Sequence, residues 1–186
     1  MNEIKDYISI IDNAIPSSLC EEIIKEYDKS LDWEEAGINQ EIVNKEARNC
    51  KFIGISLDTI INKNKDTRKK LDDNIFECTK KVMIKYNEKF KHITISRDSG
   101  YDLLKYEKGG FYTEHIDSFI NIPRTISCSF TLNDDFIGGD FSFFNNEITY
   151  TLKKGSAIIF PSNFMYPHSV LPIVQGTRYS IVTWFI

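Results

Sequence analysis

Two of the three histidines in this 186-residue chain stand where a metal site could form. His115 and Asp117 are two residues apart, and such residues project from the same face of an extended strand, so both can reach one ion. His168 follows an apolar strand-like run and a proline, and would supply a third ligand from elsewhere in the fold. Two imidazoles and one carboxylate leave part of an octahedral ion open, which suits non-heme Fe(II) that binds a co-substrate and dioxygen. We therefore predict these three residues as metal ligands and catalytic residues.

An arginine at the start of the last strand-like run adds an anion clamp to this predicted site. The guanidinium of Arg178 is planar and permanently charged, and it matches a carboxylate through two parallel hydrogen bonds. Trp184 shares a strand face with Arg178, and we expect it to pack in the fold rather than to take part in chemistry. The site is thus predicted to hold an acid that also touches the metal.

A His-x-Asp tripeptide is a weak signal by itself. It gains weight here because His115 and Asp117 end a strand-like run, His168 follows another, and Arg178 begins a third. The remaining histidine, His92, follows the polar end of a helix-like segment and has no carboxylate two residues later. We predict a solvated or helix-capping role for it.

Length and composition favour a single domain over residues 1–186, with a supporting region of helices and strands at 1–92 and a catalytic β core at 93–186. A net charge of −4, with lysines scattered among acids, argues against nucleic acid as a partner. The chain lacks a signal-peptide pattern and any apolar run of membrane-spanning length, and its four cysteines include no CxxC pair. A cytoplasmic protein without membrane attachment is expected, and the pattern gives no indication of an oligomeric state.

The order of the expected elements is helical first and β later. Ser18 and Glu21 form a plausible capping box for a first helix, whose apolar stripe would be Leu19, Ile23, Tyr27 and Leu31. Residues 32–50 are mixed and polar, and we expect loop with some strand there. A longer second helix is predicted by the stripe Leu71, Ile75, Cys78, Val82 and Tyr86. From Ile93 onward, short alternating runs broken by Gly, Pro, Asn and Asp are typical of a sandwich or barrel.

Several short motifs between Leu103 and Phe185 occur together. They are Leu104-Lys105-Tyr106, Gly109-Gly110-Phe111-Tyr112, His115-Ile116-Asp117, Leu132-Asn133-Asp134-Asp135, Gly138-Gly139, Lys154-Gly155-Ser156-Ala157, Phe160-Pro161, Pro167-His168-Ser169-Val170 and Gly176-Thr177-Arg178-Tyr179-Ser180. With these motifs the chain resembles the 2-oxoglutarate- and Fe(II)-dependent dioxygenases, in particular the prolyl 4-hydroxylase-like family. The resemblance implies a mainly β fold, a double-stranded β-helix of the jelly-roll, cupin-like kind, packed with N-terminal helices.

The resemblance also implies roles for particular residues. His115, Asp117 and His168 would hold iron, and Arg178, where collagen-type members commonly carry lysine, would pair with the distal carboxylate of 2-oxoglutarate. Tyr106 matches a family tyrosine near the co-substrate. Thr131 stands where some relatives place a tyrosine that reaches the same carboxylate, although an ordinary strand threonine fits equally well.

The implied reaction is hydroxylation of a C–H bond with release of succinate and CO2. Its implied cofactors are Fe(II), 2-oxoglutarate and O2, with ascorbate as a candidate reductant. A peptidyl proline in a protein or peptide is the favoured substrate, and a free amino acid or another small molecule is the alternative. The segment 32–50 and the loop Ser118–Arg124 are predicted to set specificity, because loops over a rigid barrel commonly do.

Two other classes of function compete with this prediction. A catalytic zinc hydrolase also uses two histidines and a carboxylate with an open position, but it leaves the Arg178 clamp unexplained. A non-catalytic barrel that binds a small acid would have no need of three metal ligands together with the clamp.

Overall fold

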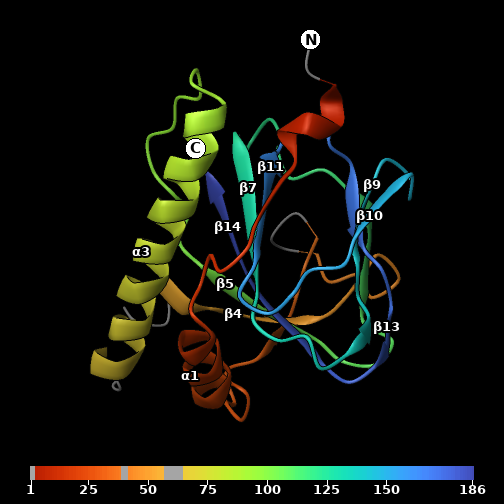
Figure 1. The fold of residues 1–186 in the computed structure, drawn as a ribbon. Helices are drawn as coiled ribbons and strands as arrows, with labels where there is room; N and C mark the ends of the chain where they lie inside the picture. The colour runs from red at the N-terminus through yellow and green to blue at the C-terminus, as the bar shows by residue number, and fades with distance from the viewer. Residues whose placement is uncertain (1–2, 39–41, 57–64) are drawn as a thin grey trace.

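The computed structural model describes residues 3–38, 42–56 and 65–186 of the chain, and this part is mainly β, with helices against one sheet (Figure 1). Within these ranges, the larger sheet has seven strands in the order β1-β11-β7-β14-β5-β4-β2. These strands are β1 (Ser9–Ile11), β2 (Glu34–Glu35), β4 (Lys51–Gly54), β5 (Asp102–Tyr106), β7 (Ile126–Thr131), β11 (Ala157–Pro161) and β14 (Arg178–Phe185).

The smaller sheet has five strands in the order β10-β9-β12-β6-β3, and a two-stranded ribbon joins β13 to β8. These strands are β3 (Arg48–Asn49), β6 (Phe111–His115), β8 (Ile137–Gly138), β9 (Phe141–Phe143), β10 (Ile148–Tyr150), β12 (His168–Val170) and β13 (Ile173–Gln175). Every regular element that the structure assigns after residue 92 is a β-strand, and the strand pairs are antiparallel. The predicted double-stranded β-helix is confirmed.

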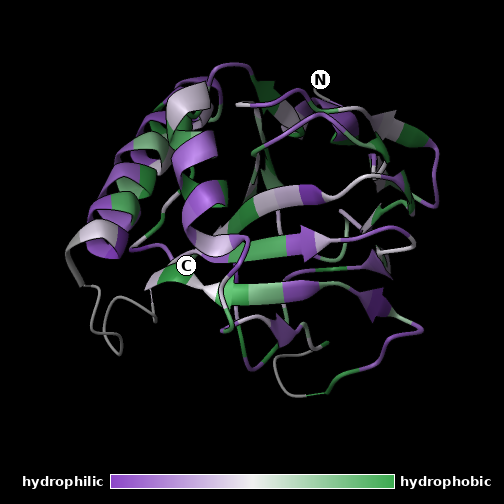
Figure 2. Ribbon diagram, turned by 90° about the horizontal axis from the view of Figure 1, so that it is seen from below, coloured by the Kyte–Doolittle hydropathy of each residue, from purple (hydrophilic) through white to green (hydrophobic). Residues whose placement is uncertain are grey.

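Two helices cover the outer face of the larger sheet, α1 (Ser17–Tyr27) and α3 (Lys65–Lys89), while a 3-10 turn, η1 (Ile4–Tyr7), precedes β1. In Figure 2, hydrophobic and hydrophilic residues alternate around the helices, as expected of amphipathic helices. The predicted stripe of the second helix is buried on α3, from Leu71 to Tyr86, so that prediction is confirmed. None of the described helices combines the length and apolar character needed to cross a membrane.

The alternation of side chains along the strands creates two separate apolar layers. Leu103 and Phe130 belong to the cluster that packs under the helices, together with Ile23 and Val82. The next residue along β5, Leu104, belongs to a second cluster between the sheets. Because successive residues point to opposite faces, each central strand helps to build both the core and the interior of the barrel.

The structure corrects the predicted start and end of the first helix. The residue before the helix is Pro16, in an extended conformation, and Ser17 is already helical, so Ser18 lies inside the first turn and is not the N-cap. The helix ends at Tyr27, and Leu31, predicted to share its apolar stripe, is 99% exposed. A stripe that fits the helical period can thus extend past the point where the helix stops packing on the sheet.

Candidate metal and co-substrate site

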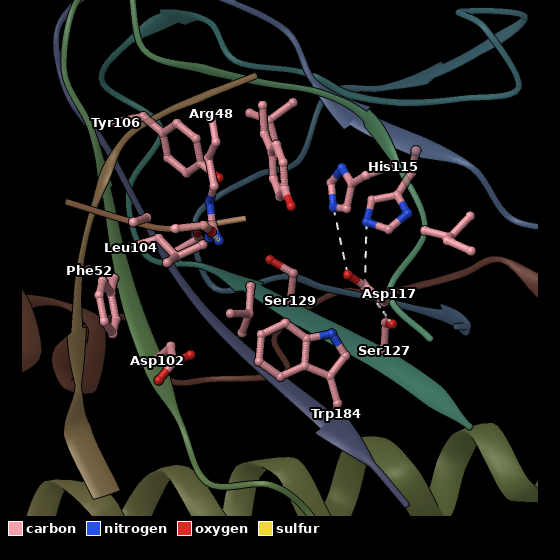
Figure 3. A pocket seen from close by; sticks show the side chains of 18 of the residues that line it. Arg48, Phe52, Asp102, Leu104, Tyr106, His115, Asp117, Ser127, Ser129 and Trp184 are labelled. Atoms are coloured by element: carbon pink, nitrogen blue, oxygen red, sulfur yellow. Dashed lines mark hydrogen bonds and ion pairs between the residues drawn. The ribbon is translucent and has the colours of Figure 1, made fainter. Parts of the chain in front are cut away.

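The three predicted metal ligands come together at the edge of the barrel interior (Figure 3). His115 ends β6, His168 begins β12, and the two residues lie directly opposite each other in the paired strands. Asp117 follows β6, and its carboxylate lies 3.6 Å from Nε2 of His115 and 3.5 Å from Nε2 of His168. One ligand atom from each residue lies within 4.8 Å of the others, so the three side chains converge on a place that could hold one ion.

Backbone carbonyls orient both imidazole rings. Nδ1 of His115 lies 2.8 Å from the Thr113 carbonyl oxygen, and Nδ1 of His168 lies 3.1 Å from that of Tyr166. A carbonyl can only accept, so each Nδ1 carries the proton and each Nε2 presents its lone pair toward Asp117. This arrangement is the one that a metal-ligating histidine needs.

The electrostatics of the triad also suit a cation. Burial opposes ionisation of Asp117, but His168, His115 and the Ser127 hydroxyl together hold the pKa of its carboxyl well below the usual value. Burial and the nearby His115 lower the pKa of His168 to about 4. At neutral pH the site therefore holds a carboxylate and a neutral imidazole, the protonation states in which these side chains bind metals.

A cavity of about 500 Å³ extends from the triad into the barrel, and Arg178 and Tyr106 line it. Arg178 is only 2% exposed, and its Nη1 donates a 3.0 Å hydrogen bond to Oγ of Ser180. Within the described residues no carboxylate forms an ion pair with this guanidinium, and burial lowers its pKa. A buried, unpaired guanidinium is costly, so a ligand carboxylate at this position would satisfy it.

Strand register explains how the predicted co-substrate residues sit relative to one another. Arg178 on β14 lies opposite Tyr106 on β5, with its guanidinium carbon 5.3 Å from the centre of the tyrosine ring. Thr131 lies opposite Ser180 on the other side of β14. Its hydroxyl is fully buried without a hydrogen-bond partner, but Thr131 is not among the residues that line the cavity. The structure thus brings Tyr106 and Arg178 together in the cavity and leaves Thr131 just outside its lining.

The Gly138-Gly139 motif lies next to Arg178, and the structure explains why a glycine is needed at position 139. Gly139 has a φ of +70°, a conformation that favours glycine. A Cβ at this position would lie 2.4 Å from Cδ1 of Ile173 and 3.1 Å from Cδ of Arg178. Because Gly139 has no side chain, the neighbouring space is free for the side chain of Arg178.

Arg48, Asp102 and Arg124 are among the cavity-lining residues that were not predicted as site residues from the sequence. Arg48, on β3, donates from Nη1 to the Gly37 carbonyl at 2.9 Å. Asp102 begins β5. Arg124 donates from Nη1 to the Asp117 carbonyl at 3.2 Å. Arg48 falls in the polar stretch 32–50, where loop with some strand was expected, and that stretch and the Ser118–Arg124 loop were expected to shape specificity.

Trp184, predicted to pack in the fold rather than to take part in chemistry, lines the cavity of the barrel. The guanidinium carbon of Arg124 lies 3.6 Å from the centre of its ring, a cation–π contact. The tryptophan shares the inward face of β14 with Arg178, as the alternation predicted, and both residues line the cavity. His92, the third histidine, is exposed and lies outside the metal cluster, in line with its predicted role.

Residues 101–186 match the family model described as the 2OG-Fe(II) oxygenase superfamily. This part of the chain, just under half of it, is thus similar to a 2OG-Fe(II) oxygenase domain. Fe(II) and 2-oxoglutarate are the cofactors of such a domain, and the residues of the cavity fit both. The triad offers nitrogen and oxygen ligands to the metal, and the buried Arg178 offers an unpaired cation to an acid.

Curated relatives are similar over less than half of the chain. A PKHD-type hydroxylase of Idiomarina loihiensis is 32% identical over 87 residues, which are 43% of this chain and 38% of the relative. One from Prochlorococcus marinus is 34% identical over 83 residues, 41% of this chain and 37% of the relative. The match therefore spans well under half the length of these relatives.

Solved structures resemble the fold over nearly the whole chain. A prolyl hydroxylase from Trichoplax adhaerens, in complex with a peptide fragment of the hypoxia inducible factor oxygen degradation domain, has a TM-score of 0.78 at 20% identity and covers 97% of this chain and 83% of its own. A prolyl-4-hydroxylase of Pseudomonas putida has a TM-score of 0.75 at 20% identity, covering 96% and 92%. At these identities the similarity establishes the fold.

Proposed function

We propose that this oxygenase domain couples the oxidative decarboxylation of 2-oxoglutarate to the hydroxylation of a C–H bond. The observation that carries the proposal is the position of Arg178, buried without a carboxylate partner in the cavity that also holds His115, Asp117 and His168. A dicarboxylic acid with a keto group matches this arrangement, because one carboxylate can pair with the guanidinium while the keto-acid end binds the metal.

The residues of the chain have separate tasks in this reaction. When bound, Fe(II) and 2-oxoglutarate supply the oxidising chemistry, with succinate and CO2 as products. His115, Asp117 and His168 hold the metal from one side, and Arg178 orients the co-substrate. Rings pack around His168, with centroids 4.7 Å away for Phe160 and 5.4 Å away for Phe141, so the metal side of the cavity is shielded from water.

For the second substrate we propose a peptidyl proline. The support is analogy of fold with the prolyl hydroxylases, one of which holds a peptide fragment. A further support is the breadth of the cavity, which Phe119 and Ile122 of the predicted specificity loop also line. For its compartment we propose the cytoplasm, because all four cysteines are free and buried.

The first test is an anaerobic titration of the Fe(II)-loaded protein with 2-oxoglutarate, observed in the visible range. A weak metal-to-ligand charge-transfer band is expected, and Asp117→Ala should abolish it. A folded, iron-loaded protein without the band would overturn the proposal and favour a zinc hydrolase or an acid-binding barrel. Proline-containing peptides are then added in air, and a gain of one oxygen atom by mass spectrometry together with succinate is the expected result.

A further inference from the structure

Asp102 lies at the opposite end of the cavity wall from the co-substrate clamp. On the inward face of β5 and β14, Arg178 pairs with Tyr106, and Val182 pairs with Asp102. Tyr106 and Asp102 are four residues apart, which at about 3.3 Å per residue is roughly 13 Å along the strand. The four C–C bonds of 2-oxoglutarate, about 1.5 Å each, cannot span that distance. Asp102 therefore faces the part of the cavity left to the second substrate.

The carboxylate of Asp102 has no partner within the described residues. It lines the cavity, yet none of its side-chain oxygens takes part in a hydrogen bond or an ion pair there. Burial raises the pKa of Asp102, and the more distant Arg48 and Arg124 act in the opposite direction. Asp102 is only partly buried, so its carboxylate is open to the cavity and can accept a hydrogen bond from a ligand that brings a donor.

The lining around Asp102 carries charges of both signs. Arg48 and Arg124 line the same cavity, and so do Glu34 and Glu35, so the lining as a whole does not call for a cationic ligand. In Figure 3, Arg48 and Asp102 lie on the same side of the cavity, away from the triad. The donor that a peptidyl substrate brings to a carboxylate in this place is the N–H of a peptide bond.

We propose that Asp102 accepts a hydrogen bond from a peptide-bond N–H of the substrate. The inference rests on the proposed function and deepens it, since it selects an amide-bearing chain over a free amino acid. Proline has no N–H, so the donor belongs to a residue beside the target proline. Asp102 is thus a substrate-recognition residue and lies outside the metal and co-substrate machinery.

The test uses protein loaded with Zn(II) and 2-oxoglutarate, so that substrate binds without turnover. Immobilised protein captures members of a library of N-acetylated, C-amidated peptides with a central proline and randomised flanks, and retained peptides are quantified by mass spectrometry. Asp102→Asn keeps an acceptor oxygen and should retain peptides as the wild type does. Asp102→Leu should lose retention about tenfold or more. Asp73→Asn, which removes a charge from the exposed Asp73 on α3, is the matched control and should behave as the wild type.

The outcomes separate this inference from the proposed function. Equal retention by Asp102→Leu and the wild type overturns the role of Asp102. If Asp102→Asn loses retention, the donor of the substrate is a cationic group and not a neutral amide, and the inference is overturned. The inference is also overturned if the wild-type protein binds free L-proline and retains no peptide. If the wild-type protein retains no peptide of the library, the inference is overturned as well. Binding of 2-oxoglutarate, measured in parallel, tests the proposed function alone, and normal binding in Asp102→Leu shows that this variant is folded.

Discussion

The hydroxyl of Ser127 donates a 2.7 Å hydrogen bond to Oδ2 of Asp117 and also lies 2.7 Å from Oγ of Ser162. Ser127 belongs to β7, in the larger sheet, while Asp117 follows β6 of the smaller sheet. A serine hydroxyl can donate only one hydrogen bond. Because Ser127 donates to Asp117, the hydroxyl of Ser162 must be the donor in its hydrogen bond with Ser127. This chain of hydroxyls fixes the carboxylate between the two sheets.

Replacing Ser127 with alanine should weaken metal binding by roughly 10–100-fold, because an oriented ligand loses its supporting hydrogen bond. The affinity for Co(II), measured by titration of the metal-free protein, gives the value. Ser129→Ala is the matched control, since Ser129 is the next inward residue of β7 and its hydroxyl has no partner within the described residues. Equal affinities in the two variants would show that Ser127 does not position Asp117.

Replacing His115 or Asp117 with alanine should abolish succinate formation while the protein stays folded. Both side chains serve an open cavity, so their loss removes a metal ligand and leaves the apolar clusters intact. Succinate release and thermal unfolding are measured side by side, with His92→Ala as a control at an exposed histidine. Undiminished succinate formation in either site variant would remove the triad from the catalytic machinery.

Replacing Arg178 with alanine should chiefly raise the concentration of 2-oxoglutarate needed for saturation. The lost bond is charge-assisted and buried, so we expect a rise of roughly 10–100-fold. Arg178→Lys keeps the charge without the bidentate geometry and should give an intermediate value. Anaerobic titration measures each dissociation constant, and Arg97→Ala, at an exposed position, is the control. Unchanged saturation would mean that another group holds the distal carboxylate.

The metal-free protein should lose stability as the pH falls from 6.5 toward 4. The pKa of His168 is lowered from 6.5 to about 4 by burial and by His115, so in this range the unfolded chain binds a proton that the folded protein does not. The free energy of unfolding then decreases on acidification by up to about 1.4 kcal/mol per pH unit. Asp117 adds to this slope only at the acidic end of the range, because its pKa is lowered from 3.8 in the folded protein and the unfolded chain takes up that proton only near pH 4.

Urea unfolding of the metal-free protein at several pH values measures this slope. In His168→Asn the slope should shrink, while in His92→Asn it should stay as in the wild type, because His92 is exposed. A slope that survives in His168→Asn would assign the pH dependence to another group.

The local spacing of the sequence indicated the His115–Asp117 pair and the clamp, whereas His168 joins that pair only because β12 lies beside β6. His115 and Asp117 depend only on the two-residue period of a strand, and the alternation of the last strand already placed Arg178 and Trp184 on one face. The apolar stripe of α3 was likewise local, because a helix repeats within a few residues. The end of α1 could not be predicted from local spacing, because this helix ends where its packing on the sheet ends. Leu31, beyond that end, is exposed.

The substrate side of the cavity depended on the tertiary structure. Arg48 lies in the cavity because β3 pairs with β6, and Asp102 faces the second substrate because β5 lies between β14 and β4. The pairing of strands that are far apart in sequence is not visible in the residue pattern of either strand. The roles of Arg48 and Asp102 could therefore not be predicted from the sequence. The sequence by itself determined the chemistry of the site, which rests on residue types and local geometry. Only the folded chain decided which charges surround the substrate, because those contacts join segments that are far apart in sequence.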